Sequence, residues 1–267
     1  MSDIPDMVQA LAKSAGIRFD FKEQFIPGAP LRWQWKEGRS HRGEPQFQDN
    51  YDKALPDGNY DALVVTDGVP RGGAELEAET VDYLARFQAY ATTQNPRCQV
   101  YYYETWHHIT SGTPQNSEYD TASPRRTLRW RERLSADRAM WDGIVSEANK
   151  RNAGKGRPIL MIPAGRALAM LDDAVKRGEV PGIVKTRDYF DDEIHLNPYG
   201  KYFVACVHFA VLFNRSPVGL TGDAKGRWGE SYWDTRNWQG KSWARPDPAA
   251  ITAMQRIAWE AVRAQLK

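Results

Sequence analysis

Two side chains in the second half of the chain have the types and spacing of an acid–base pair. Asp192 and His195 lie three positions apart in the run Asp192-Glu193-Ile194-His195. At this spacing a carboxylate can accept the Nδ1 proton of the imidazole, which fixes the tautomer and leaves Nε2 to act as a base. The alternative is an aspartate that caps the following helix beside a structural histidine. The position of the run, in a loop before an apolar helix, favours the catalytic interpretation.

A second polar group follows a predicted strand, in the run Glu104-Thr105-Trp106-His107-His108. Because ligands of α/β sheets bind at the carboxyl ends of the strands, we expect Glu104, Trp106 and His107 to contact substrate. A metal site is less favoured, since adjacent histidines in an extended chain point in opposite directions. A purely structural role is the third interpretation. We therefore expect neither a metal nor any other cofactor.

Short apolar runs and helical periodicity predict the elements that would position these residues. Strands are predicted at 17–26, 61–66, 98–103 and 158–162, and helices at 6–15, 75–94, 128–150, 165–177, 199–213 and from 248 onward. A turn is expected at 27–30, whereas 31–59 and 111–126 are predicted to be irregular. The alternation predicts an α/β fold with a mostly parallel sheet and helices on both faces. We assign 1–267 to one domain, in which 214–267 is a C-terminal loop and helix extension.

The composition restricts the class of protein. With 36 basic and 34 acidic residues among 267, the formal charge of +2 argues against a nucleic-acid partner. Five arginines between 125 and 133 are predicted to form a solvated helix face, with an anion-binding patch as the alternative. No apolar run approaches the length of about 18 residues that a membrane span needs. Nothing after Met1 is typical of a signal peptide, which indicates a cytoplasmic protein unless a leader precedes it.

The segment Asp192-Glu193-Ile194-His195-Leu196-Asn197-Pro198-Tyr199-Gly200, followed by a helix, resembles the final block of the SGNH (GDSL) hydrolases. These are esterases, lipases and carbohydrate O-acetylesterases on a flavodoxin-like sheet. The order of elements fits that family across most of the chain, and the last block is the specific match. The resemblance implies a three-layer fold and a serine ester hydrolase acting on acyl esters, including O-acetyl groups of carbohydrates. Asp192 would orient the base and His195 would be the base.

Two further positions correspond to oxyanion-binding blocks of that family. Gly28 resembles the glycine of the second block, whose backbone N–H helps to bind the oxyanion, although a plain turn glycine is an equal alternative. Asp67 lies where the third block normally has Gly-x-Asn-Asp, and we assign it to the same oxyanion or substrate-binding region. The asparagine donor of that block is missing from Thr66-Asp67-Gly68.

The start of the chain departs from the family pattern. The family begins with an apolar strand that leads into the nucleophilic serine, whereas this sequence begins at the next helix. Ser2 is the only serine before that helix, where it would either be the N-cap or serve as the nucleophile. We therefore expect a truncated form whose strand and nucleophile lie upstream. The alternatives are a catalytically inactive ligand-binding protein of the same fold, and a metal-dependent hydrolase that uses Asp67, His107, Asp192 and His195.

Overall fold

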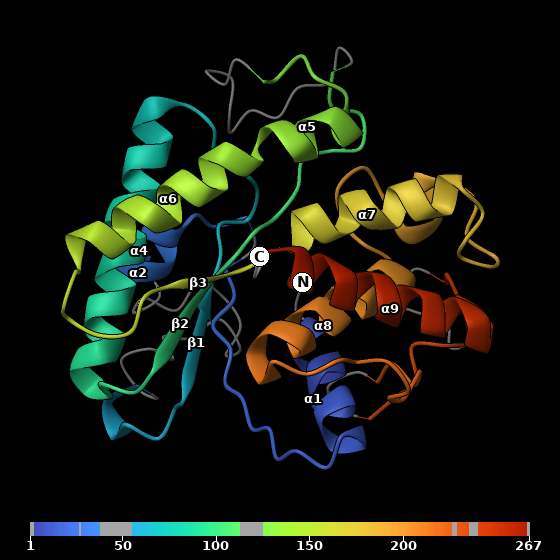
Figure 1. Cartoon of the computed structure of the whole chain (residues 1–267), viewed down its shortest axis with the longest axis horizontal. Coiled ribbons are helices and arrows are strands. Elements are labelled where there is room, and N and C mark those ends of the chain that lie inside the picture. Colours follow the sequence, from blue (N-terminus) through green and yellow to red (C-terminus); the bar gives the residue numbers. More distant parts are fainter. Residues whose placement is uncertain are drawn as a thin grey trace. The chain divides into compact units, whose positions relative to one another are not determined.

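The computed structural model describes residues 3–26, 28–37, 55–112, 125–225, 229–234 and 240–265. The chain divides into two compact units, one of residues 22–162 and one that combines 1–21 with 163–267. The structure belongs to the α/β class, because it combines a three-stranded parallel sheet with helices (Figure 1). This confirms the predicted class and is consistent with a flavodoxin-like fold.

The sheet lies in the unit of residues 22–162. Its strands are β1 (Ala62–Val65), β2 (Gln99–Tyr103) and β3 (Leu160–Ile162), in the order β1-β2-β3 and all parallel. Three of the four predicted strands are thus confirmed. The central strand β2 is buried along its whole length, as expected of a parallel strand between two neighbours. Val65 pairs with Tyr102, and Tyr102 with Met161, so these three side chains form one row across the sheet.

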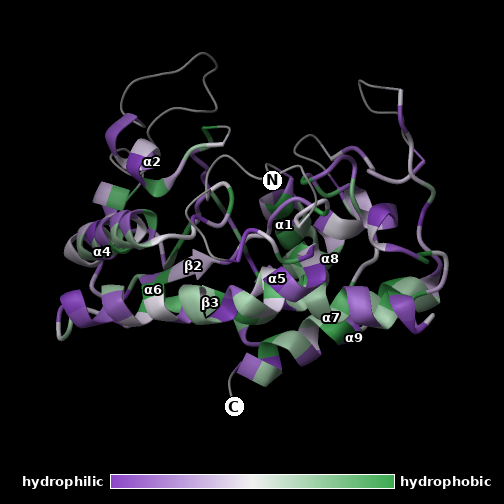
Figure 2. Cartoon of the chain, turned by 90° about the horizontal axis from the view of Figure 1, so that it is seen from above, coloured by the Kyte–Doolittle hydropathy of each residue, from purple (hydrophilic) through white to green (hydrophobic). Residues whose placement is uncertain are grey.

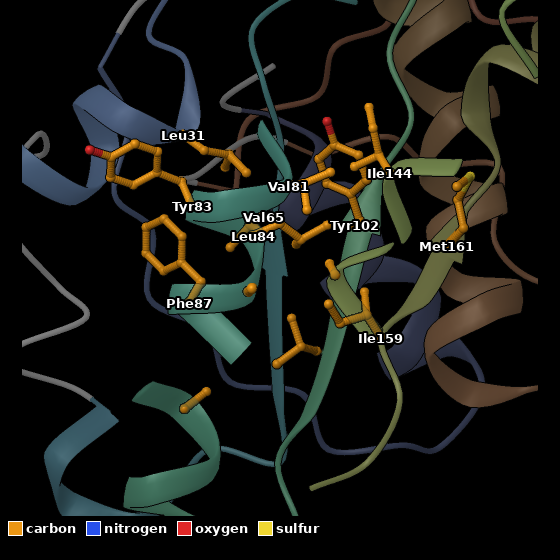
Figure 3. Close-up of a cluster of buried hydrophobic side chains, with 14 of the residues drawn as sticks. Leu31, Val65, Val81, Tyr83, Leu84, Phe87, Tyr102, Ile144, Ile159 and Met161 are labelled. Carbon is orange, nitrogen blue, oxygen red and sulfur yellow. The ribbon is translucent and has the colours of Figure 1, made fainter. Parts of the chain in front are cut away.

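Two long helices cover that row and form the core of this unit. They are α4 (Ala74–Gln94) and α6 (Arg138–Arg151), which pack against each other. Val81, Leu84 and Phe87 repeat at helical spacing along α4, so they share one face. Figure 3 shows these side chains gathered beside the strands, in one buried cluster with the strand row. The short helices α2 (Leu31–Glu37), η2 (Leu55–Asp57) and α5 (Trp130–Ala136) complete this unit.

The second unit is helical and is built around one apolar helix. That helix, α8 (Pro198–Phe213), packs against α1 (Ile4–Ser14), α7 (Ala164–Lys176) and α9 (Pro248–Gln265). Hydrophobic and hydrophilic residues alternate around α7 and α9 in Figure 2, as expected of helices with one buried face. The short η4 (Thr186–Tyr189) precedes the loop that carries Asp192 and His195.

The fourth predicted strand, at 17–26, is absent: these described residues form no strand. Its alternating aromatic residues have another role, because the Phe19 ring contacts the rings of Phe21 and Phe213 at centroid distances of 5.9 and 5.8 Å. Gln9 also donates a hydrogen bond to the Phe19 carbonyl. A period-two pattern shows that a segment is extended, but a strand also needs a hydrogen-bonded neighbour.

Two helix predictions also need correction. The helix predicted at 128–150 is two helices, α5 and α6, that meet at the buried Asp137. The region 31–59, predicted to be irregular, contains α2 and η2. Residues 38–54 of that region, with His41, lie outside the described residues.

No helix in the described part of the chain combines the length and the apolar character needed to cross a bilayer.

Candidate functional site

The structure brings Asp192 and His195 into direct contact. The Nδ1 atom of His195 lies 2.7 Å from Oδ2 of Asp192, which is the hydrogen bond that their spacing predicts. The other carboxylate oxygen, Oδ1, accepts the backbone N–H groups of Ile194 at 2.8 Å and His195 at 2.7 Å. An ionised carboxylate can only accept, so Nδ1 of the ring is the donor; in a neutral imidazole Nε2 then carries the lone pair. This is the tautomer that a general base requires.

The same hydrogen bonds keep Asp192 ionised. Partial burial raises the pKa of this carboxyl, but the backbone N–H groups of His195 and Ile194 and the His195 ring outweigh that effect. The net result is a pKa of about 2, so the negative charge that orients the ring is present at neutral pH. The His195 side chain is 68% exposed, which leaves the ring accessible to a solute.

A short hairpin-like frame holds the loop that carries this pair. The backbone N–H of Asp191 donates to the carbonyl of His195 at 2.7 Å, and Phe190 forms an antiparallel bridge with Leu196. Asn197 then caps α8, because its Oδ1 accepts the backbone N–H groups of Tyr199 and Gly200. The loop is therefore closed at its base, next to the first turn of a buried helix.

Glycine is required at position 200 for steric reasons. A Cβ atom at Gly200 would collide with the carbonyl oxygen of Tyr189 and would lie 2.7 Å from Cδ2 of Leu196. Only glycine lets the first turn of α8 approach the chain that enters the loop so closely. The glycine in Asn197-Pro198-Tyr199-Gly200 therefore positions the two ends of the loop.

Asp172 is a buried support of this loop that the sequence did not reveal. Its Oδ1 accepts hydrogen bonds from the hydroxyls of Thr186, at 2.5 Å, and Tyr189, at 3.0 Å. Its Oδ2 lies 2.6 Å from Nζ of Lys176. Asp172 on α7 thus binds the first and the last residue of η4, Thr186 and Tyr189. The chain continues from η4 directly into the candidate site. A single aspartate on an amphipathic helix carries no sequence signal of this role.

The predicted oxyanion glycine is exposed and lies next to a second glycine. Gly28 has φ +68°, in the left-handed region, and directly precedes Ala29, whose N–H donates to the Ile26 carbonyl. A Cβ at Gly68 would come within 3.2–3.3 Å of backbone atoms of Gly28. The loops after residue 26 and after β1 therefore touch through backbone atoms. An oxyanion-binding role for Gly28 remains a prediction.

Asp67 is buried and holds three elements of its unit together. It is 1% exposed and accepts the Leu31 N–H at 2.8 Å, the Tyr102 hydroxyl at 2.9 Å and the Thr80 hydroxyl at 3.1 Å. Burial raises the pKa of Asp67, and these hydrogen bonds oppose the rise only in part. In this structure Asp67 joins α2, α4 and β2 to the end of β1. Its assignment to substrate binding remains a prediction.

The run after β2 is buried rather than open. Glu104, Trp106 and His107 are only 1%, 4% and 2% exposed, and the Trp106 ring contacts the Tyr103 ring edge-on. Nε2 of His107 lies 3.0 Å from Oδ2 of Asp137. Burial lowers the pKa of His107, which favours a neutral ring. This environment suits the structural alternative, and substrate contact by these three residues remains a prediction.

The arginine cluster contributes to the same buried group. Arg133 is 2% exposed with Nε 3.3 Å from Asp137, and Nε of Arg125 lies 2.7 Å from the other Asp137 oxygen. The prediction of a solvated face is therefore wrong for Arg133, whereas the Arg125 side chain is 22% exposed. Although burial raises the pKa of Asp137, its contacts with His107 and the arginines lower it overall, so Asp137 is ionised. The sequence does not predict this network, because tertiary packing determines which of these charged side chains are buried against one another.

Two remaining expectations concern the nucleophile and metals. Ser2 lies outside the described residues. Within the residues that the structure does describe, no group of three or more His, Cys, Asp or Glu side chains is arranged to hold a metal ion.

Comparison with known proteins identifies a shared fold. The solved structure of a DUF4886 family protein from Bacteroides uniformis ATCC 8492 is similar to this chain, with a TM-score of 0.61 and 16% sequence identity. The alignment covers 97% of this chain and 89% of that chain. No family model and no curated protein matches the sequence. The likeness therefore extends to the architecture of nearly the whole chain.

Proposed function

We propose that this protein is a serine ester hydrolase of SGNH type, in which Asp192 and His195 form the acid–base part of the catalytic triad. The observation that carries the proposal is the hydrogen bond of 2.7 Å between His195 Nδ1 and an aspartate whose pKa is about 2. An ionised, hydrogen-bonded carboxylate holds the imidazole in the basic tautomer and stabilises the imidazolium that forms during catalysis. The proposal includes a three-layer fold, in which helices cover both faces of a flavodoxin-like sheet.

The proposed reaction is acyl transfer in two steps. Nε2 of His195 accepts the proton of a serine hydroxyl as the oxygen attacks the ester carbonyl, and then returns that proton to the departing alcohol. The resulting acyl-enzyme is cleaved by water, whose proton passes through the same nitrogen. Asp192 stays ionised throughout and orients the ring.

The nucleophile in this proposal belongs to a block upstream of Met1 that includes one more strand, with Ser2 as the second candidate. The exposure of β1 supports an additional strand. In the described sheet β1 is an edge strand, yet its sequence Ala-Leu-Val-Val is wholly apolar and Val64 is 37% exposed; Leu160 of the other edge strand, β3, is 47% exposed. The unpaired backbone N–H and C=O groups of an apolar edge strand can pair with another chain, and proteins normally protect such an edge. A further strand beside β1 would provide that protection.

The test compares the 267-residue chain with a version extended by the upstream reading frame, using p-nitrophenyl acetate as substrate. We expect the extended protein to hydrolyse the ester and the 267-residue chain to be nearly inactive. In the extended protein, His195→Ala should lower kcat by about a thousandfold or more, because the triad acts as a unit. Asp192→Asn should lower kcat by a similar or smaller factor, since it spoils tautomer and orientation.

Glu193→Gln is the matched control, because Glu193 is an exposed carboxylate in the same loop that pairs with Arg187 at 2.9 Å. This variant should keep kcat within about twofold of the wild type, since exposed ion pairs contribute little. Full activity of His195→Ala would refute the proposal. Activity of the 267-residue chain that survives Ser2→Ala and is abolished by a chelator would point to a metal-dependent hydrolase. Ligand binding without turnover in the extended protein would point to an inactive binding protein.

A further inference from the structure

Asp3 occupies the N-cap position of α1, but its side chain does not cap that helix. Aspartate is favoured at this position because its carboxylate can accept the free backbone N–H groups of the first turn. The Asp3 carboxylate accepts none of them, whereas its backbone carbonyl accepts the Met7 N–H at 3.2 Å and so begins the helix. The carboxylate is therefore available for contacts outside α1.

The Asp3 carboxylate binds two side chains from elsewhere in its own unit. It forms an ion pair with Nζ of Lys201 and accepts a hydrogen bond from the hydroxyl of Tyr232. Although burial raises the pKa of Asp3, Lys201 and Tyr232 lower it overall, so Asp3 is ionised. The side chains of Lys201 and Asp3 are only 23% and 24% exposed, so solvent screens this ion pair less than a pair on the open surface.

The first partner, Lys201, lies in the first turn of α8. Its backbone N–H donates to the carbonyl of the cap residue Asn197 at 2.9 Å, and Asn197 follows His195 by two positions. The helices α1 and α8 also pack against each other (Figure 1). The ion pair of Lys201 with Asp3 thus joins the start of α1 to the base of the loop that carries His195.

The second partner, Tyr232, leads to the same turn of α8. The next residue, Trp233, stacks its ring on Tyr199 of that turn at a centroid distance of 5.5 Å. Nε1 of Trp233 donates to the carbonyl of Gly222 at 2.8 Å, which fixes the indole in this position. Two separate routes therefore connect Asp3 with the first turn of α8.

We propose that Asp3 is a positioning residue, which holds the chain that enters α1 against the base of the His195 loop. This role rests on the proposed function, because both candidate nucleophiles precede Asp3 in the chain. Proton transfer requires the nucleophile and its base to approach to about 2.6–3.2 Å. A shift of the α1 entry by about 1 Å would therefore slow the attack on the ester strongly.

The position of the chain that precedes α1 can be measured without any hydrolysis. A nitroxide spin label on Ser2→Cys broadens the NMR signals of nearby protons, and this broadening falls steeply with distance. The label is selective, because both native cysteines are buried. In the 267-residue chain we expect the label to broaden the His195 ring signals, and we expect Asp3→Asn or Lys201→Gln to reduce that broadening severalfold.

Three further variants serve as controls for this measurement. Lys201→Arg keeps the positive charge, so it should retain the broadening. Asp20→Asn is the matched control, because Asp20 pairs with Arg18 at 2.8 Å through mostly exposed side chains, and such a pair contributes little. Tyr232→Phe removes only one hydrogen bond, so it should reduce the broadening by a smaller factor. It replaces Asp3→Asn as the test if that substitution lowers the melting temperature.

The kinetics of the extended protein separate positioning from a purely structural role. Asp3→Asn and Lys201→Gln should each lower kcat for p-nitrophenyl acetate by about tenfold or more and leave KM within about twofold, because only the approach of the nucleophile to its base changes. Lys201→Arg should restore most of the kcat that Lys201→Gln loses. Asp20→Asn should leave both constants unchanged.

Unchanged broadening in both Asp3→Asn and Lys201→Gln would overturn the positioning role, and so would an unchanged kcat of Asp3→Asn in an active extended protein. Reduced broadening in these variants of a protein whose extended form lacks esterase activity would keep the positioning role of Asp3 and remove the proposed hydrolase. Esterase activity without any broadening of the His195 signals would do the reverse.

Discussion

The histidine inside α8 should make the folded protein sensitive to mild acid. His208 is 6% exposed and lies on a helix packed by α1, α7 and α9. Burial disfavours the charged ring and lowers the pKa of His208 from 6.5 to about 3. In the unfolded chain the ring regains its ordinary pKa, so the two states bind different numbers of protons between these values.

The sign and size of the effect follow from this difference. The stability linked to the neutral ring is fully present above pH 6.5 and is lost as the pH falls from 6.5 towards 3. Each pH unit within that window lowers the free energy of unfolding by about 1.4 kcal/mol. Between pH 6.5 and pH 4, His208 should therefore remove about 3 kcal/mol, a large part of the stability of a typical domain.

The assay is urea denaturation at pH 7 and pH 4 for the wild type and for His208→Gln. Carboxylates contribute to the pH dependence of both proteins, so the difference between the two pH dependences isolates the histidine. We expect the wild type to lose about 3 kcal/mol more than the variant between these pH values. His208→Leu provides a second comparison. A change in stability at pH 7 caused by either substitution does not affect the test, because only the loss between the two pH values is compared. Equal pH dependence in the wild type and both variants would refute the reasoning.

Two further predictions concern the buried supports. Asp67→Ala should lower the free energy of unfolding by about 3 kcal/mol, because Leu31 N–H and the Tyr102 hydroxyl lose a buried acceptor. Tyr102→Phe, which removes one of those donors, should cost only about 1 kcal/mol in the same denaturation experiment, and equal losses would contradict this account. Gly200→Ala should cost about 1–3 kcal/mol, because its Cβ would overlap the Tyr189 carbonyl. It should also shift the NMR signals of the His195 ring, whereas an unchanged spectrum and melting temperature would exclude a positioning role.

Much of the secondary structure was predictable because its signals are local. The strands β1, β2 and β3 are short apolar runs, and the helices around them repeat apolar residues at helical spacing. The last helix starts at Pro248, as predicted, and the Ala249 N–H donates to the Asp247 carboxylate at 2.7 Å. The contact between Asp192 and His195 was also predictable, because the two residues lie three positions apart in one loop.

Tertiary structure alone decided which polar side chains are buried and what they bind. Asp67 takes its partners from positions 36, 35 and 13 residues away, and no local pattern encodes such distances. Strand formation at 17–26 failed for the same reason, since a ladder depends on a neighbour elsewhere in the chain. The periodicity of apolar residues in a segment indicates whether that segment favours a helix or an extended conformation. The partner of a buried carboxylate depends on which distant segments the packing of the core brings beside it.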